Sequence, residues 1–353
     1  MKKNQKLAQR RRTILGAGAA VASLTATLAL APSASAAAAT TARFDRVHGV
    51  LTVVAGDSGG TTLVGRDAAG VIDVNAGAVA IQGPRATVRN VDRIVMLGGD
   101  GSDRLAINEQ NGRLPRATIH GGAGDDELFG GSRQDRLFGD GGSDTLIGDG
   151  GADVVQGGAG RDQVIWTPGD GRDTVEGQAG KDTLEFNGTA APENFDLSAN
   201  GSHAQLVRDV GDVTMDLTGI ERVDLTAVVG QDAVTVGDLS GTDVTEADVD
   251  LAGAPGGPTG DNSADSVVVN ATRGADTATV TGDQQHGVTV SGLHALVKVL
   301  GTDGPSDVLT FNALGGNDTV DATGLAAGVI GLTVNGGAGT DVLSGGQDTV
   351  LVQ

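Results

Sequence analysis

The sequence predicts an all-β fold in which many short strands stack into a solenoid. A nine-residue unit repeats five times without a break between residues 121 and 165. Glycine accounts for 59 of the 353 residues, aromatic residues for only 2%, and short runs of Val, Thr and Leu separate the Gly/Asp clusters. Glycine at this level disfavours helix, and the short apolar runs favour strands. Because a fixed period is the signature of stacked architectures, we expect coils rather than one globular core.

The first 36 residues have the features of an export signal. They contain six Lys or Arg residues and no acidic residue, followed by a weakly apolar Ala/Gly stretch from 14 to 31. Ala34, Ser35 and Ala36 then provide the small residues of a signal-peptidase site. We therefore predict that residues 1–36 are a removed signal peptide and that the protein is secreted. Arg11 and Arg12 fit the twin-arginine type, and an Arg-rich Sec signal fits equally well.

The charge of the mature chain limits its partners. Removal of the six positive charges would take the net charge from −21 to −27. Such a charge repels nucleic acids and anionic membranes, so neither is an expected partner. No segment beyond the signal is long and apolar enough to span a bilayer, so we expect no membrane span in the mature form. The lack of cysteine excludes disulfides.

Residues 37–97 are predicted to form N-terminal solenoid coils, with strands at 50–55, 71–74, 78–81 and 94–97. The segment 56–60 reads GDSGG, which is the nucleophile signature of chymotrypsin-like proteases. That chemistry needs a histidine base and an aspartate, and in that family both precede the serine. Only His48 precedes Ser58 in the mature chain. A Gly/Ser turn between two strands is therefore the better interpretation.

Residues 98–185 are predicted to form an array of nine-residue units. The five continuous units read GGAGDDELF, GGSRQDRLF, GDGGSDTLI, GDGGADVVQ and GGAGRDQVI, and further copies lie at 98–106, 168–176 and 177–185. The first six residues must turn tightly, and the last three form a short strand with the eighth residue facing inward. Two units then make one 18-residue coil, and Trp166 and Thr167 interrupt the phase. The eighth-place residues expected inside are Leu105, Leu128, Leu137, Leu146, Val155, Val164, Val175 and Leu184.

The sixth place of every unit is aspartate, which indicates a metal site repeated many times. In stacked coils these carboxylates line up in columns and repel each other, so we expect the array to be disordered without a counter-ion. Calcium takes six to eight oxygen ligands from carboxylates and main-chain carbonyls. Without cysteine or clustered histidine, softer metals have little support. We therefore predict several Ca²⁺ ions and calcium-dependent folding. The expected carboxylate ligands are Asp103, Asp126, Asp135, Asp144, Asp153, Asp162, Asp173 and Asp182.

The unit GGxGxDxUx, where U is a large apolar residue, resembles the RTX or hemolysin-type calcium-binding repeat of exported bacterial proteins. The resemblance implies a parallel β-roll or β-helix solenoid with calcium-binding turns between successive coils. It also implies that the sixth-place aspartates provide carboxylate oxygens and that the turn residues provide carbonyl oxygens. The first- and third-place residues so implied are Gly121, Ala123, Gly130, Ser132, Gly139, Gly141, Gly148, Gly150, Gly157 and Ala159.

Five units depart from this pattern. Arg133 replaces the fourth-place glycine, so its turn is expected to be strained or free of metal. Asp140 and Asp149 replace second-place glycines and either add ligands or are solvated. Pro168 replaces a first-place glycine and Gln178 a second-place glycine, so the sites of Asp173 and Asp182 are less regular.

Residues 186–353 are predicted to form a C-terminal solenoid with longer, degenerate repeats. Residues 98–128 align without gaps to residues 313–343, and a module of about 42 residues repeats 270–282 as 312–324. Residues 230–232 are a weaker third copy of the Gly-x-Asp turn, 44 residues earlier. The segment 252–260 is the best loop candidate. The segment 347–352 faintly resembles the secretion tail of RTX proteins, but a terminal strand is the better interpretation.

These features favour a secreted, non-enzymatic calcium-binding β-solenoid. We expect it to fold where calcium reaches millimolar levels and to have a structural or adhesive role at the cell surface or outside the cell. Its candidate partners, besides calcium ions, are a cell-surface polysaccharide or protein. The alternative is a calcium-dependent polysaccharide lyase or hydrolase on a parallel β-helix, although scarce aromatic residues provide few platforms for sugar rings. The sequence contains no HExxH motif, so nothing in it indicates a zinc protease.

Overall fold

The computed structural model describes residues 40–353 except 57 and 258, so the expected export signal lies outside the described residues. The described residues form 30 strands, one short 3₁₀ turn at Asn75–Gly77 and no α-helix. The predicted all-β, parallel-strand fold is therefore confirmed. Within this part of the chain, no helix has the length and apolar character needed to cross a membrane.

The chain divides into two compact units, which we describe separately. The repeat unit comprises described residues 40–185 together with 213–221. The C-terminal unit comprises described residues 186–212 and 222–353. The division of the sequence into four segments remains a prediction.

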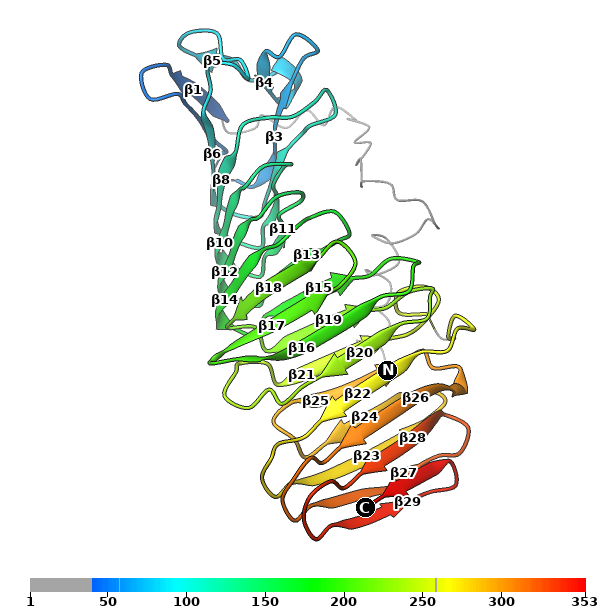
Figure 1. The fold of residues 1–353 in the computed structure, drawn as a ribbon. Helices are drawn as coiled ribbons and strands as arrows, with labels where there is room; N and C mark the ends of the chain where they lie inside the picture. The colour runs from blue at the N-terminus through cyan, green and yellow to red at the C-terminus, as the bar shows by residue number, and fades with distance from the viewer. Residues whose placement is uncertain (1–39, 57, 258) are drawn as a thin grey trace. The chain divides into compact units, whose positions relative to one another are not determined.

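The repeat unit consists of two sheets whose strands stack along the unit (Figure 1). One sheet has the order β18-β14-β12-β10-β8-β6-β2-β1-β5, and the other has the order β15-β13-β11-β9-β7-β3-β4. The strands of the repeat unit are β1 (Thr41–Asp45), β2 (Val50–Val54), β3 (Gly60–Arg66), β4 (Ile72–Val74), β5 (Ile81–Gln82), β6 (Arg93–Asp100), β7 (Asp103–Ile107), β8 (Ala117–Ala123), β9 (Glu127–Phe129), β10 (Arg136–Gly142), β11 (Thr145–Ile147), β12 (Val154–Gly160), β13 (Gln163–Trp166), β14 (Thr174–Gly180), β15 (Thr183–Asn187) and β18 (Val213–Thr218).

The register of the parallel strands gives the length of each coil. Leu137 in β10 lies opposite Ile119 in β8 and Val155 in β12, a step of 18 residues in each direction. Val155 lies opposite Val175 in β14, a step of 20, because Trp166 and Thr167 lengthen that coil. The expected 18-residue coil and its interruption are thus both present. All eight eighth-place apolar residues are buried.

The N-terminal coils match the expected strands less closely. Strands β2, β4 and β6 overlap the predicted segments 50–55, 71–74 and 94–97. The predicted strand at 78–81 is wrong over most of its length, because residues 75–77 form the 3₁₀ turn and β5 begins only at Ile81. Strands β1 and β3 were not predicted. In β1 only Ala42 and Phe44 are buried, so this strand gives a weak apolar signal.

The C-terminal unit also has two sheets, with the orders β30-β28-β26-β22-β20-β16-β17 and β29-β27-β23-β24-β25-β21-β19. Most neighbours are parallel, whereas β16–β17 and β23–β24–β25 are antiparallel. Its strands are β16 (Asn194–Asn200), β17 (His203–Arg208), β19 (Arg222–Thr226), β20 (Ala233–Val236), β21 (Glu246–Asp250), β22 (Ser266–Asn270), β23 (Thr277–Asp283), β24 (Gly287–Ser291), β25 (Leu296–Leu300), β26 (Gly304–Asn312), β27 (Thr319–Leu325), β28 (Ile330–Asn335), β29 (Val342–Gly345) and β30 (Thr349–Val352).

The longer sequence repeats correspond to longer coils. Val267 lies opposite Leu309, a 42-residue coil that contains the antiparallel strands β23, β24 and β25. Leu309 lies opposite Leu332, and Met96 lies opposite Ile119 in the repeat unit, so both are 23-residue coils. The ungapped match of 98–128 with 313–343 therefore reflects one coil geometry used twice.

The proposed third copy of the 42-residue module at 230–232 is wrong. The Asp232 amide donates to Asp265, whereas the Asp276 amide donates to Asp318. The two aspartates therefore belong to different columns of turns. They share the Gly-x-Asp turn because each such turn ends in an acid before a strand, and that local need does not fix which side of the coil the turn occupies.

Candidate metal-binding turns

The eight sixth-place aspartates of the repeat unit lie in two columns, because each coil contains two turns. In both columns, the main-chain N–H of one aspartate donates to the carboxylate Oδ1 of the aspartate one coil further on. All eight aspartates are at most 5% exposed. The first column joins Asp103 to Asp126 (2.7 Å), Asp126 to Asp144 (2.8 Å), Asp144 to Asp162 (2.9 Å) and Asp162 to Asp182 (2.8 Å). The second column joins Asp135 to Asp153 (2.7 Å) and Asp153 to Asp173 (2.8 Å).

The second carboxylate oxygen of most column members has no hydrogen-bond donor. The Oδ2 atoms of Asp126, Asp144, Asp153, Asp162 and Asp182 are buried and unpartnered. A buried anionic oxygen without a partner is costly and is rare in folded proteins. Each of these turns therefore presents one oxygen that needs a positively charged partner.

The first-place glycines show what surrounds that oxygen. A Cβ placed on Gly121 would lie 2.3 Å from Asp126 Oδ2 and 2.8 Å from the carbonyl oxygen of Gly139. A Cβ placed on Gly139 would lie 2.4 Å from Asp144 Oδ2 and 2.3 Å from the carbonyl oxygen of Gly157. Each glycine thus faces a carboxylate oxygen of its own turn and a carbonyl oxygen of the next coil. Two oxygens of negative partial charge directed at one place suit a hard cation.

Burial of the columns changes the protonation of their carboxylates. Burial raises the pKa of Asp144 to about 7, opposed by the hydrogen bond from the Asp126 amide, with Asp162 among the carboxylates that raise it further. Burial likewise raises the pKa of Asp153 to about 9, with Asp173 adding to the effect. A cation in these turns therefore competes with protons near neutral pH. Burial also raises the pKa values of Asp126, Asp135 and Asp182 to about 6 and that of Asp173 to about 7.

The donor set of the turns fits calcium. Among residues 40–353 other than 57 and 258, no three His, Cys, Asp or Glu side chains are placed to hold one ion between them. The oxygens that converge are instead a single carboxylate Oδ2 and a first-place carbonyl. Calcium accepts this mixture of carboxylate and carbonyl oxygens. The residues that would hold it are the sixth-place aspartates and the first-place glycines of the next coil.

The third-place residues have a different setting. The carbonyl oxygens of Ala123 and Gly141 accept main-chain N–H groups of the preceding coil, from Gly101 at 2.6 Å and from Gly124 at 2.8 Å. Ala123 is also exposed. The structure thus brings first-place carbonyls to the unpartnered carboxylates and engages these two third-place carbonyls in bonds between coils.

In the turn that contains Arg133, main-chain N–H groups satisfy both oxygens of the aspartate. Gly131 N–H donates to Asp135 Oδ2 at 2.7 Å, and Ala117 N–H donates to Asp135 Oδ1 at 2.5 Å. Both oxygens of Asp135 therefore have donors, in contrast to the five aspartates whose Oδ2 atoms have none. This geometry favours a turn without metal, although metal occupancy there stays a prediction.

The second-place substitutions adopt the left-handed backbone that glycine favours. The φ angles of Asp140, Asp149 and Gln178 are 68°, 56° and 70°. Aspartate tolerates this region better than most residues do. The turns therefore keep their shape at a cost in backbone strain.

Sequence analysis missed several acids that occupy equivalent places. Glu221 Oε2 accepts the Asp182 amide at 2.7 Å and continues the first column. In the C-terminal unit, Glu193, Asp232, Asp265 and Asp307 form a further column. All five lie outside the glycine-rich nonapeptides, so the nonapeptide pattern did not identify them. Their common signal is an acid followed two residues later by a buried apolar residue.

In the part of the chain that the structure describes, the remaining polar motifs do not gather into one site. His48 pairs with Asp45 at 2.7 Å, and His286 pairs with Asp283 at 2.8 Å, each within one exposed turn. His120 stacks on Phe138 with ring centroids 4.5 Å apart. Ser58 lies in the turn between β2 and β3, next to residue 57, which is outside the described part.

Comparison with known proteins identifies the repeats. The family model of the RTX calcium-binding nonapeptide repeat matches four segments, residues 118–132, 129–164, 169–188 and 333–349. Three of these lie in or next to the nonapeptide array. The fourth contains the residues that sequence alignment paired with 118–128. A comparison with curated proteins finds no match.

Proposed function

We propose that this chain, which carries RTX calcium-binding nonapeptide repeats, is a secreted calcium-binding β-roll protein whose repeat unit completes its fold when calcium enters the turns. The single observation that carries the proposal is the set of unpartnered carboxylate Oδ2 oxygens in the two columns. Each oxygen lies beside a first-place glycine, and for Gly121, Gly139 and Gly157 a carbonyl oxygen of the next coil faces the same place.

Calcium supplies the positive charge that this arrangement lacks. Without it, the stacked carboxylates repel each other and must take up protons to stay buried. With it, the carboxylate and carbonyl oxygens become ligands that hold successive coils together. The metal therefore acts on the fold itself, as structural metal ions do.

We further propose that the protein works outside the cell in a structural or adhesive role and is not an enzyme. Residues 1–36 have the composition of an export signal, and extracellular calcium concentrations match the affinity range of extracellular calcium modules, about 10⁻⁴ to 10⁻³ M. The exported protein would gain its full stability only after it meets this calcium. A cell-surface polysaccharide or protein is the partner class we expect.

Calorimetric titration of the full chain with CaCl₂ tests calcium binding. We expect several sites with affinities of about 10⁻⁴ to 10⁻³ M. Magnesium is the matched control, because it requires octahedral geometry and keeps its water ligands, so it should bind more weakly. The absence of binding heat at calcium concentrations 10-fold above this affinity range would refute the proposal.

Export has its own test. Deletion of residues 1–36 should leave the protein inside the producing cell, and the double change Arg11→Lys and Arg12→Lys should block export only if the twin-arginine route is used. Export of the deletion variant at the normal level would exclude the proposed signal.

A further inference from the structure

The C-terminal unit contains a third column of acids, outside the four segments that match the repeat family. Glu193 N–H donates to Asp232 Oδ1 at 2.8 Å, Asp232 N–H to Asp265 Oδ1 at 2.8 Å, and Asp265 N–H to Asp307 Oδ1 at 3.0 Å. These bonds span 39, 33 and 42 residues, so the coils are much longer than those of the nonapeptide array. The same hydrogen-bond ladder is thus built from unrelated turn sequences.

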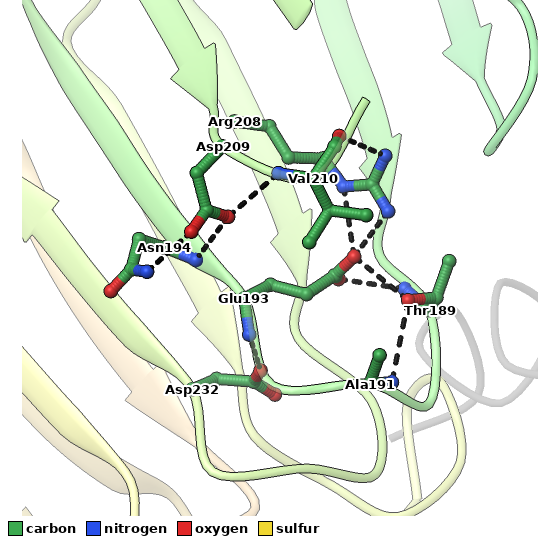
Figure 2. Close-up of polar contacts among 8 residues, drawn as sticks. All are labelled: Thr189, Ala191, Glu193, Asn194, Arg208, Asp209, Val210 and Asp232. Carbon is green, nitrogen blue, oxygen red and sulfur yellow. Dashed lines mark hydrogen bonds and ion pairs between the residues drawn. The ribbon is translucent and has the colours of Figure 1, made fainter. Parts of the chain in front are cut away.

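The first member of this column is neutralised within the chain. Arg208 Nε donates to Glu193 Oε1 at 2.9 Å, and Thr189 N–H donates to Glu193 Oε2 at 2.7 Å (Figure 2). The side chains of Glu193 and Arg208 are 0% and 4% exposed. Figure 2 shows the guanidinium directed at the Glu193 carboxylate, while the Glu193 amide points to Asp232.

The turn before Glu193 has the geometry of the nonapeptide turns. A Cβ placed on Gly188, five residues before Glu193, would lie 2.5 Å from Glu193 Oε2 and 2.9 Å from the carbonyl oxygen of Thr226. Gly121 has the same relation to Asp126 and to the carbonyl oxygen of Gly139. In this turn, Arg208 supplies the positive charge that the nonapeptide turns lack. Glu193 can therefore be buried as an anion, because the Arg208 guanidinium neutralises its charge.

The last member is satisfied in another way. Asp307 Oδ1 accepts the Asp265 amide, and its Oδ2 accepts Asp303 N–H at 2.6 Å. Both oxygens thus have main-chain donors, as both oxygens of Asp135 do in the repeat unit.

The two middle members, Asp232 and Asp265, have neither an arginine partner like that of Glu193 nor main-chain donors for both oxygens like those of Asp307. Asp232 is 1% exposed and Asp265 is 3% exposed, and the Oδ2 atom of each has no hydrogen-bond donor. Asp261 and Asp303 bring two more carboxylates to these turns, accepting N–H groups from Gly230 and from Asn262. Burial, together with a smaller effect of neighbouring carboxylates, raises the pKa of Asp232 to about 7 and that of Asp265 to about 6, against the opposing main-chain hydrogen bonds.

We propose that Asp232 and Asp265 form a cation site in the C-terminal unit that takes a hard divalent ion such as Ca²⁺. The two Oδ2 oxygens are its fixed carboxylate ligands, and the half-buried carboxylates of Asp261 and Asp303 add negative charge around them. The site lies on the turns 227–232 and 260–265, neither of which is a glycine-rich nonapeptide. It extends calcium binding beyond the repeats, yet it depends on none of their residues.

The test uses the full chain with Asp265→Asn. Asparagine keeps an oxygen that can accept the Asp232 amide but replaces the unpartnered oxygen with an N–H₂ group. We expect equilibrium dialysis with CaCl₂ to show one bound ion fewer than in the unmodified protein. We also expect a smaller rise of Tm when calcium replaces EDTA, with Tm in EDTA unchanged or higher.

Asp307→Asn is the matched control, because it sits in the same column with both oxygens already hydrogen-bonded. It should bind as many ions as the unmodified protein. If Asp265→Asn does not fold, Asp232→Asn serves as the second variant with the same expectation. Full calcium stoichiometry and an unchanged calcium shift of Tm in a folded variant would overturn the proposed site. If the unmodified protein itself binds no calcium, the function proposed for the repeats fails as well.

Discussion

At the residue scale, most sixth-place aspartates divide their two carboxylate oxygens between two tasks. This holds for five of the eight, Asp126, Asp144, Asp153, Asp162 and Asp182: Oδ1 accepts a main-chain N–H from the neighbouring coil, and Oδ2 faces the turn without a donor. Asparagine can stack between coils, since Asn270, Asn312 and Asn335 form their own ladder at 2.9 and 2.7 Å. The preference for aspartate in the turns is therefore explained by charge and not by stacking alone.

Asp144→Asn should separate these two tasks. The variant keeps an acceptor for the Asp126 amide but loses the anionic oxygen. We expect it to lower stability in calcium by about 1–3 kcal/mol, the usual range for a buried polar group that loses its partner, and to leave stability in EDTA unchanged or raised. Thermal unfolding under both conditions measures the difference. Equal losses in calcium and in EDTA would show that Asp144 has only a packing role.

Asp135→Asn is the control for that substitution. Both Asp135 oxygens accept main-chain N–H groups, so the new N–H₂ group would face the donor of Gly131. This variant should be less stable than the unmodified protein, and the loss of stability should be similar with and without calcium.

Gly139→Ala tests the place that the oxygens surround. The added Cβ would lie 2.3 Å from the Gly157 carbonyl oxygen and 2.4 Å from Asp144 Oδ2, so atoms must shift. We expect calcium affinity at this turn to fall at least 10-fold, which corresponds to about 1.4 kcal/mol. Gly150→Ala is the matched control, because its Cβ would meet no atom closer than 3.5 Å. Equal affinities of the two variants, measured by calorimetry, would contradict the assignment.

At the element scale, short strands and turns depend on each other. Strand β11 has only three residues, and its buried Leu146 lies opposite Leu128 and Val164 of the two neighbouring coils. Such a strand has little apolar surface of its own. Its order therefore depends on the turns that precede it.

Hydrogen exchange should reveal that dependence. On calcium removal, peptides from 121–182 should lose protection, because their turn amides belong to the aspartate ladder. Peptides from the antiparallel pair β16–β17 should stay protected, since the neighbouring Glu193 carboxylate is held by Arg208. Equal loss in both regions would indicate that calcium acts on the whole chain and not on the repeat turns.

The elements also show how much of the fold can be predicted from the sequence alone. The nonapeptide strands, their inward residues and the 18-residue coil follow from glycine and aspartate spacing, because each unit repeats one local geometry. The N-terminal strands β1 and β3 and the column through Asp232 and Asp265 do not. Their partners lie 33 to 43 residues away or arise from hairpins, and a sequence pattern gives no coil length for such contacts. The Arg208–Glu193 ion pair could not be predicted either, because no sequence pattern indicates that these two residues lie together.

At the scale of the whole molecule, charge and protonation decide when the chain is stable. Burial raises the folded-state pKa of Asp126, Asp144 and Asp153 above the ordinary value of an aspartate. A raised pKa means that the folded state binds more protons than the unfolded state. In EDTA, stability should therefore be greatest below about pH 4 and should fall as the pH rises through 6 to 9.

Calcium should reverse this trend. The ion binds deprotonated carboxylates, so its affinity should fall as the pH drops below about 7. Tm measured from pH 5 to pH 9 should decrease with pH in EDTA and increase with pH in calcium. Parallel curves under the two conditions would show that protons and calcium do not compete for the same groups.

The most direct measurement is circular dichroism together with hydrodynamic radius on the full chain, first in EDTA and then with millimolar calcium. The account predicts a larger radius and reduced β signal in EDTA near pH 8, and a return to a compact, β-rich state when calcium is added. A chelated protein that is equally compact and equally β-rich would contradict the claim that calcium completes the fold of the repeat unit.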